Sequence, residues 1–131
     1  MRMIFVNLPI KDLAASRSFF SALGYSFNED FSDDTAAAAM VVSDNIFVML
    51  LTHEKFKGFI NGEMADGHKV TEVLTALSCD SRQEVDDIFA KALKAGAKPW
   101  KPVMDMGFMY GCSFQDLDGH VWEYVFMEQA A

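Results

Sequence analysis

The sequence predicts an α+β fold in which the order strand, helix, strand, strand, strand occurs twice. Two amphipathic segments that begin with helix-capping residues predict helices near residues 12–24 and 81–96. Short segments rich in β-branched and aromatic residues surround them and predict strands. The pattern that begins at residue 5 recurs at residue 74, an offset of 69 residues. A repeat of this size indicates two modules that pack together, because neither buries its sheet face alone.

The first module is predicted to begin with a strand at residues 3–10. A helix follows, with Asp12 as its N-cap and Gly24 as the residue just beyond its end. Its apolar side chains share one face of the helix: Leu13, Phe19, Phe20 and Leu23. The remaining strands of this module are expected at residues 25–30, 35–42 and 46–52, with a turn at 43–45.

The second module has the strongest helix signal in the chain. Ser81 and Glu84 form a capping box, and Gly96 follows the last apolar position. The apolar positions follow the helical spacing: Val85, Ile88, Phe89, Ala92 and Leu93. Strands are expected at residues 73–79, 97–104, 108–115 and 120–127. The pair Asp118-Gly119 predicts a tight turn between the last two. We therefore expect one domain over residues 1–131, with module one at 1–52, a linker at 53–70 and module two at 71–131.

Composition and charge limit the classes of partner. The chain has 131 residues and 51% hydrophobic content, enough for a real core. Its net charge of −8 opposes binding to nucleic acid or to an anionic membrane surface. No apolar run is long enough to span a bilayer, and no signal-peptide pattern is readable at the N-terminus. Cys79 and Cys112 lack metal-type or redox-type spacing. These features predict a cytoplasmic protein with no nucleic-acid or membrane partner.

Two segments between the predicted elements allow more than one interpretation. The connection at residues 53–69 is long and contains Phe56, Phe59 and Ile60, so it is either a linker or a lid over a pocket. The acidic run Glu29-Asp30 with Asp33-Asp34 is either a solvated turn or the source of a field that attracts a cationic ligand.

Both ends of the chain resemble the vicinal oxygen chelate superfamily, which includes glyoxalase I, the extradiol dioxygenases and the bleomycin-resistance proteins. The opening similarity lies in the sequence VNLPIKDL at residues 6–13, with Ser16, Phe19-Phe20 and Leu23-Gly24. The closing sequence FQDLDGHVWE at residues 114–123 resembles the ending F-x-D-P-D-G-x-x-x-E. The resemblance covers essentially the whole chain and implies two βαβββ modules whose mixed sheets curl into a cup.

The resemblance also implies four positions for a divalent metal, one on the first and one on the last strand of each module. In this sequence they fall on Phe5 with Asn7 next on its face, Met49 or Leu50, Leu74 with Ala76 as its neighbour, and Glu123. Only Glu123 is a good ligand, and three of the four positions are apolar. We therefore expect no cofactor. A divalent metal would need a divergent site, such as Glu123 with His53 and Glu72.

Glu123 is the candidate catalytic residue. In an apolar cup its carboxylate could act as a general acid or base, or it could be a structural carboxylate held by a hydrogen bond. The candidate ligand-binding residues are Phe5, Asn7, Met49, Leu74, Trp100, Phe108 and Tyr110. Methionine and aromatic walls suit an adaptable apolar pocket, and the same side chains equally suit core packing and a dimer interface.

The sequence leaves two classes of function open. We expect a metal-independent small-molecule-binding protein, similar to the bleomycin-resistance group, whose specific ligand the sequence does not identify. The alternative is an enzyme, either a lyase that resembles lactoylglutathione lyase or a dioxygenase-like protein, with a divergent site around Glu123. The resemblance further implies a homodimer.

Overall fold

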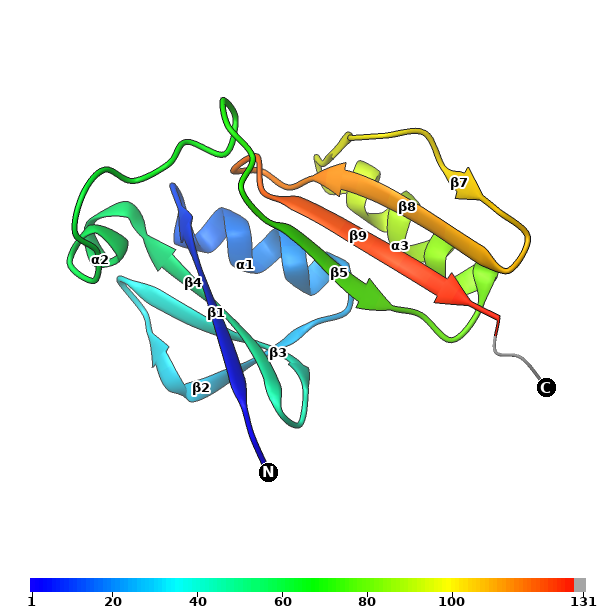
Figure 1. Cartoon of the computed structure of the whole chain (residues 1–131). Coiled ribbons are helices and arrows are strands. Elements are labelled where there is room, and N and C mark those ends of the chain that lie inside the picture. Colours follow the sequence, from blue (N-terminus) through cyan, green and yellow to red (C-terminus); the bar gives the residue numbers. More distant parts are fainter. Residues whose placement is uncertain (129–131) are drawn as a thin grey trace. The chain divides into compact units, whose positions relative to one another are not determined.

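The computed structural model describes residues 1–128 and has the predicted α+β class (Figure 1). The first half follows the βαβββ order and adds a short helix, whereas the second half has four strands after its helix. The chain divides into two compact units, Met1–Ala65 and Asp66–Ala131. Each unit has its own mixed sheet, with strand order β1-β4-β3-β2 in the first. The second has the order β5-β9-β8-β6, and β7 also pairs with β8. The predicted fold class is therefore confirmed, with two separate sheets.

The elements of the first unit lie close to their predicted ranges. They are β1 (Ile4–Ile10), α1 (Leu13–Ala22), β2 (Ser26–Asp33), β3 (Ala37–Ser43), β4 (Ile46–Thr52) and α2 (His53–Lys57). The Asp12 side chain caps α1 by accepting a hydrogen bond from the Ala15 amide at 3.0 Å. Gly24 follows α1 with φ at 103°, a conformation that glycine adopts at helix ends.

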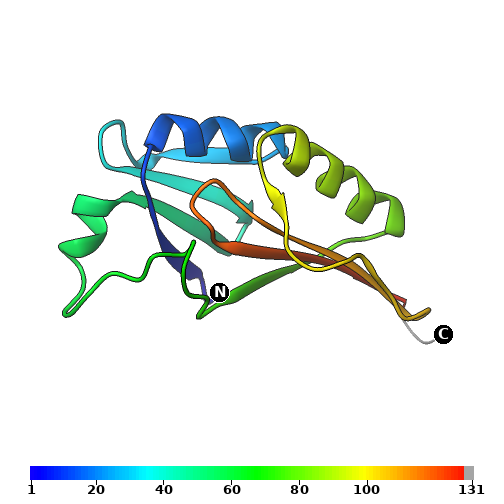
Figure 2. The same ribbon diagram turned by 90° about the horizontal axis from the view of Figure 1, so that it is seen from above.

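The sheet of the first unit has two different faces. Strand β1 runs parallel to β4, and the register pairs Asn7 with Met49 and Leu8 with Leu50. Leu50 is fully buried, as are Phe19 and Phe20 of α1, the helix that lies along one face of this sheet (Figure 2). Because neighbouring residues of a strand point to opposite faces, Asn7 and Met49 lie together on the other face. Leu50 is thus part of the core.

The second unit repeats this plan. Its elements are β5 (Leu74–Ser78), α3 (Arg82–Lys94), β6 (Lys98–Pro99), β7 (Met104–Asp105), β8 (Met109–Gln115) and β9 (Val121–Met127). The single strand predicted at 97–104 is wrong, since two short strands flank an irregular stretch there. Pro99 and Pro102 explain the break, because proline lacks the N–H that a continuous ladder requires.

The core of the second unit lies between its sheet and α3. Phe114 and Trp122 are fully buried, as is Val85 from the helix. The capping box holds in part: Ser81 accepts from the Glu84 amide at 3.0 Å, while the Glu84 carboxylate accepts from the Asp80 amide at 2.7 Å. Among the described residues no helix is long and apolar enough to cross a membrane.

Both cysteines are buried free thiols in this unit. Burial is the main cause that raises the pKa of Cys79 to about 12 and the pKa of Cys112 to about 11. The thiol, not the reactive thiolate, is therefore the form present at neutral pH, in keeping with the lack of redox-type spacing in the sequence.

The turn between β8 and β9 is built around a buried carboxylate. One oxygen of Asp116 accepts hydrogen bonds from the amides of Asp118 and His120, and the other accepts from the indole N–H of Trp122 at 2.9 Å. Burial raises the pKa of Asp116, while His120 and the hydrogen bond from Trp122 act in the opposite direction. The carboxylate thus joins the turn to the largest side chain of the core.

Candidate functional site

The sheet face of the first unit that carries Asn7 has a hollow of about 550 Å³, called here the apolar hollow. It is lined by Asn7, Leu51, Phe56, Phe59 and Ile60. Strands β1 and β4 supply the floor, and α2 with the residues after it supplies the wall. Helix α2 begins directly after β4 because the Thr52 hydroxyl accepts a hydrogen bond from the Lys55 amide at 3.4 Å. The segment predicted as linker or lid therefore borders a cavity.

A second hollow of about 540 Å³ lies beside α2 and is called here the polar hollow. It is lined by Thr35, Ala36, Thr52, Glu54, Lys55, Gly58 and Phe59. Phe59 borders both hollows and is 68% exposed. The Lys55 ammonium lies 5.4 Å from the centre of the Phe59 ring, a cation–π contact.

Asn7 is the polar group of the apolar hollow. Its amide nitrogen donates a hydrogen bond to the Phe5 carbonyl at 3.3 Å, which fixes the side chain. Within residues 1–128 the Asn7 amide oxygen accepts no hydrogen bond, so it can accept one from a ligand. Phe5 stacks on Phe47 beside it, with ring centres 5.2 Å apart. The structure thus brings Phe5, Asn7 and Met49 onto one face.

The candidate residues of the second unit fall on different parts of its sheet. Glu123 is half-buried on β9, opposite Ala76 on β5 and Ser113 on β8. Its carboxylate forms no hydrogen bond or ion pair in the part of the chain that the structure describes. Leu74, at the start of β5, is 52% exposed. Trp100 follows β6 and is half-exposed, and its amide donates to the Ser113 carbonyl at 3.1 Å.

Tyr110 lies on the opposite face from Glu123. The register pairs Tyr110 with Phe126, three positions along β9 from Glu123, so their side chains point to opposite sides of the sheet. The Tyr110 hydroxyl donates to the Asp86 carboxylate on α3 at 2.5 Å. The Arg82 guanidinium lies 4.9 Å from the ring centre and also binds Asp105 at 3.1 Å.

Phe108 lies in the turn between β7 and β8 and is 58% exposed. The contacts that Arg82 makes with Asp105 and with the Gly107 carbonyl at 2.6 Å hold this turn against α3. The structure therefore does not gather Phe108 and Tyr110 on the sheet face that carries Glu123.

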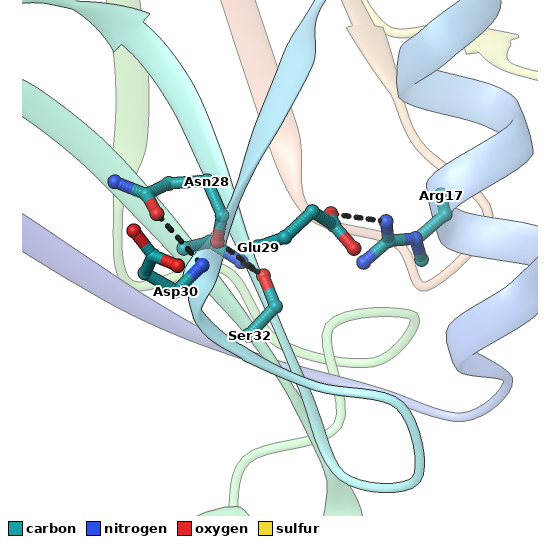
Figure 3. A network of polar contacts seen from close by, with 6 residues as sticks. Arg17, Asn28, Glu29, Asp30 and Ser32 are labelled. Carbon is teal, nitrogen blue, oxygen red and sulfur yellow. Dashed lines mark hydrogen bonds and ion pairs between the residues drawn. The ribbon is translucent and has the colours of Figure 1, made fainter.

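Two side chains of the acidic run, Glu29 and Asp33, bind other residues of the first unit. Figure 3 shows the Glu29 side chain reaching from β2 to Arg17 on α1, a pair with a distance of 2.6 Å. Asn28 accepts from the Asp30 amide at 2.9 Å through its side chain, and its carbonyl accepts from the Ser32 hydroxyl (Figure 3). Asp33 accepts from the amide and the hydroxyl of Thr35, which lowers its pKa. All four acidic residues are exposed, but Glu29, Asp30 and Asp33 lie on β2 and only Asp34 lies in the turn that follows, so the prediction of a turn over the whole run is wrong.

The four metal positions implied by the sequence do not offer a metal's usual donors. The strand registers pair Asn7 with Met49 and Ala76 with Glu123. These positions supply one carboxylate, one neutral amide oxygen and two side chains that are apolar or weak donors. Across residues 1–128, no three His, Cys, Asp or Glu side chains gather in a metal-binding group. The residues present do not fit a metal centre of the implied kind.

Comparison with known proteins bears on the fold. Residues 2–43 match the family model described as bleomycin resistance protein-like N-terminal. A hypothetical protein from S. aureus superimposes with a TM-score of 0.82 at 24% identity, over 96% of this chain and 94% of that one. A glyoxalase/bleomycin resistance protein/dioxygenase family enzyme from Burkholderia phytofirmans PsJN gives a TM-score of 0.78 at 16% identity, over 97% and 99%. The chain has the vicinal oxygen chelate fold.

A third structure with the vicinal oxygen chelate fold is a variant of the fosfomycin resistance protein FosX from Listeria monocytogenes. It was complexed with Mn(II) and 1S,2S-dihydroxypropylphosphonic acid. It gives a TM-score of 0.67 at 16% identity, over 92% of this chain and 85% of that one. Among curated proteins, no sequence matches this chain. The resemblance drawn from the two ends of the sequence is confirmed at the level of the vicinal oxygen chelate fold.

Sequence reasoning missed several residues that line the hollows of this vicinal oxygen chelate fold. They are Leu51 in the apolar hollow, and Thr35, Ala36, Thr52, Glu54, Lys55 and Gly58 in the polar hollow. The short helix itself is predictable from the sequence, because a threonine at the end of an apolar strand, three residues before Lys55, is an N-cap signal. The polar hollow has no such signal, because residues 35 and 36 meet α2 only in the folded unit.

Proposed function

We propose that this chain is a metal-independent small-molecule-binding protein. The apolar hollow carries the proposal, because it combines concave apolar walls with a fixed amide, the combination typical of small-ligand sites. Its volume of about 550 Å³ is within the range of such sites. Asn7 would orient a ligand hydroxyl or N–H group, and Phe56, Phe59 and Ile60 would cover the apolar body.

A neutral fluorescent dye, Nile red, tests this proposal. We expect saturable binding to the wild-type protein, and about tenfold weaker binding to Phe59→Ser, because the loss of contact with one aromatic ring removes about 1.4 kcal/mol. Phe31→Ser is the matched control, since Phe31 is also an exposed phenylalanine of the first unit, at 56%, and does not line either hollow. Titration of dye fluorescence measures both variants. Equal affinities for Phe59→Ser and Phe31→Ser would contradict the proposal.

The alternative function is a metal-dependent lyase or dioxygenase-like enzyme, and Glu123 is the residue that favours it. If the protein binds its ligand without a metal, titration calorimetry with Mn²⁺, Ni²⁺ and Zn²⁺ should detect no stoichiometric binding, because a single carboxylate holds a divalent ion weakly. Because Glu123 does not line the apolar hollow, Glu123→Gln should also leave Nile red binding unchanged. One equivalent of tightly bound metal in the wild-type protein, lost in Glu123→Gln, would instead support the enzyme.

We further propose that the protein forms a homodimer. Exposed apolar side chains on both units support this, among them Phe5, Leu74 and Met127. Sedimentation equilibrium should give about twice the chain mass of 14.6 kDa.

A further inference from the structure

The apolar and polar hollows lie on neighbouring faces of the segment that contains α2. Phe56 and Ile60, four residues apart, face the apolar hollow. Thr52, Lys55 and Phe59 line the polar hollow. Phe59 borders both, so one side chain separates two spaces of similar volume. A molecule that lies over Phe59 would reach into each.

The polar hollow offers side chains that can form further hydrogen bonds. Glu54 and Lys55 are exposed, and neither forms an ion pair or a side-chain hydrogen bond within residues 1–128. The Thr52 hydroxyl accepts the helix-capping bond and donates none there, so its proton is also available. Together these side chains provide one strong acceptor and two donors.

Charges of both signs in the polar hollow indicate which ligand group fits it. Hydrogen bonds from Thr35 lower the pKa of Asp33, with a smaller contribution from Lys55, so a second carboxylate lies within the field of that ammonium. A cationic group would be attracted by Glu54 and Asp33 and repelled by Lys55, and an anionic group would meet the reverse. An uncharged group rich in hydroxyls can donate to Glu54 and accept from Lys55 without repulsion.

We propose that the two hollows bind the two ends of one amphipathic molecule. Its apolar body lies in the apolar hollow, and its uncharged polyhydroxylated head lies among Thr52, Glu54 and Lys55. This inference rests on the proposed function and names the class of ligand. Phe59 contacts the ligand where body and head join, and the Lys55 ammonium above its ring lies at the same junction.

Two matched probes test the inference. They are 2-methoxynaphthalene, which has the apolar body alone, and 2-naphthyl β-D-glucopyranoside, which adds a sugar head. We expect the glucoside to bind about tenfold more tightly, because hydrogen bonds to charged groups contribute most. Lys55→Met and Glu54→Gln should each weaken glucoside binding about fivefold or more, and each should weaken binding of 2-methoxynaphthalene by a smaller factor. Nuclear magnetic resonance titration of the full chain measures all these affinities.

Lys57→Met is the matched control, because Lys57 lies on the same helix and lines neither hollow. Circular dichroism melting of each variant shows whether the fold persists. If the glucoside binds no better than 2-methoxynaphthalene, or if Lys55→Met and Lys57→Met behave alike, the amphipathic ligand is excluded while the proposed function stands. If neither probe binds to the wild-type protein, both fail.

Discussion

Replacement of Asp116 by alanine should lower the free energy of unfolding by about 3 kcal/mol, because it removes the acceptor of a buried network. The carboxylate receives hydrogen bonds from two backbone amides and from the Trp122 indole. Trp122 is fully buried, so its N–H would remain unpaired in the core. Leaving a buried donor unsatisfied costs about 1–3 kcal/mol, and the two turn amides add to that loss.

Urea unfolding followed by tryptophan fluorescence measures this effect. Asp116→Asn keeps the shape of the side chain and one acceptor oxygen, so its loss should be smaller than that of Asp116→Ala. Asp44→Ala is the control, because Asp44 is an exposed turn aspartate in the first unit and should change stability by less than about 0.5 kcal/mol. A loss for Asp116→Ala no larger than that of the control would show that the network contributes little.

Replacement of Gly119 by alanine should destabilise the protein by a similar or larger amount, about 3 kcal/mol or more. Gly119 has φ at 84°, and a Cβ atom there would lie 2.5 Å from the carbonyl carbon of Gly67 and 2.6 Å from the amide nitrogen of His68. Both are backbone atoms of the segment before β5, so relief requires the displacement of main chain. The glycine is needed for close approach as well as for its backbone conformation.

Gly24→Ala separates these two causes. Gly24 has φ at 103°, and a Cβ atom there would have no other atom within 4 Å. Its replacement should therefore cost about 1 kcal/mol, from backbone strain alone. Thermal unfolding of the two variants under the same conditions gives the comparison. Equal losses would mean that residues 67 and 68 move aside freely.

Much of the fold could be predicted because its signals are local. The capping residues Asp12 and Ser81 stand at the observed helix starts, and Asp118-Gly119 lies in the observed turn. The strand predicted at 97–104 is split because Pro99 and Pro102 lack backbone N–H donors. Proline lacks this donor whichever strand lies beside it, so the break could be predicted from the sequence alone.

The site was only partly predictable, because cavities depend on contacts between distant residues. Asn7 was a candidate from its place on the first strand, and it does line the apolar hollow. Phe56 and Phe59 were noted only as members of a linker or lid, since nothing local shows that α2 lies against β1 and β4. Strand alternation places Met49 but cannot show that Tyr110 is held by Asp86 on α3.

The parallel pairing at the edge of each sheet has a consequence for folding kinetics. Ile4 pairs with Ile46, 42 positions later, and Leu74 pairs with Val121, 47 positions later. Each pairing requires the closure of a long loop, and the entropy cost of that closure comes before the pairing stabilises the fold. Such contacts raise the contact order and slow folding. Strands β1 and β5 are synthesised before their parallel partners β4 and β9, so these pairs cannot form until the later strand has emerged. Each unit therefore has an interval in which an apolar strand edge is open to pairing with other chains.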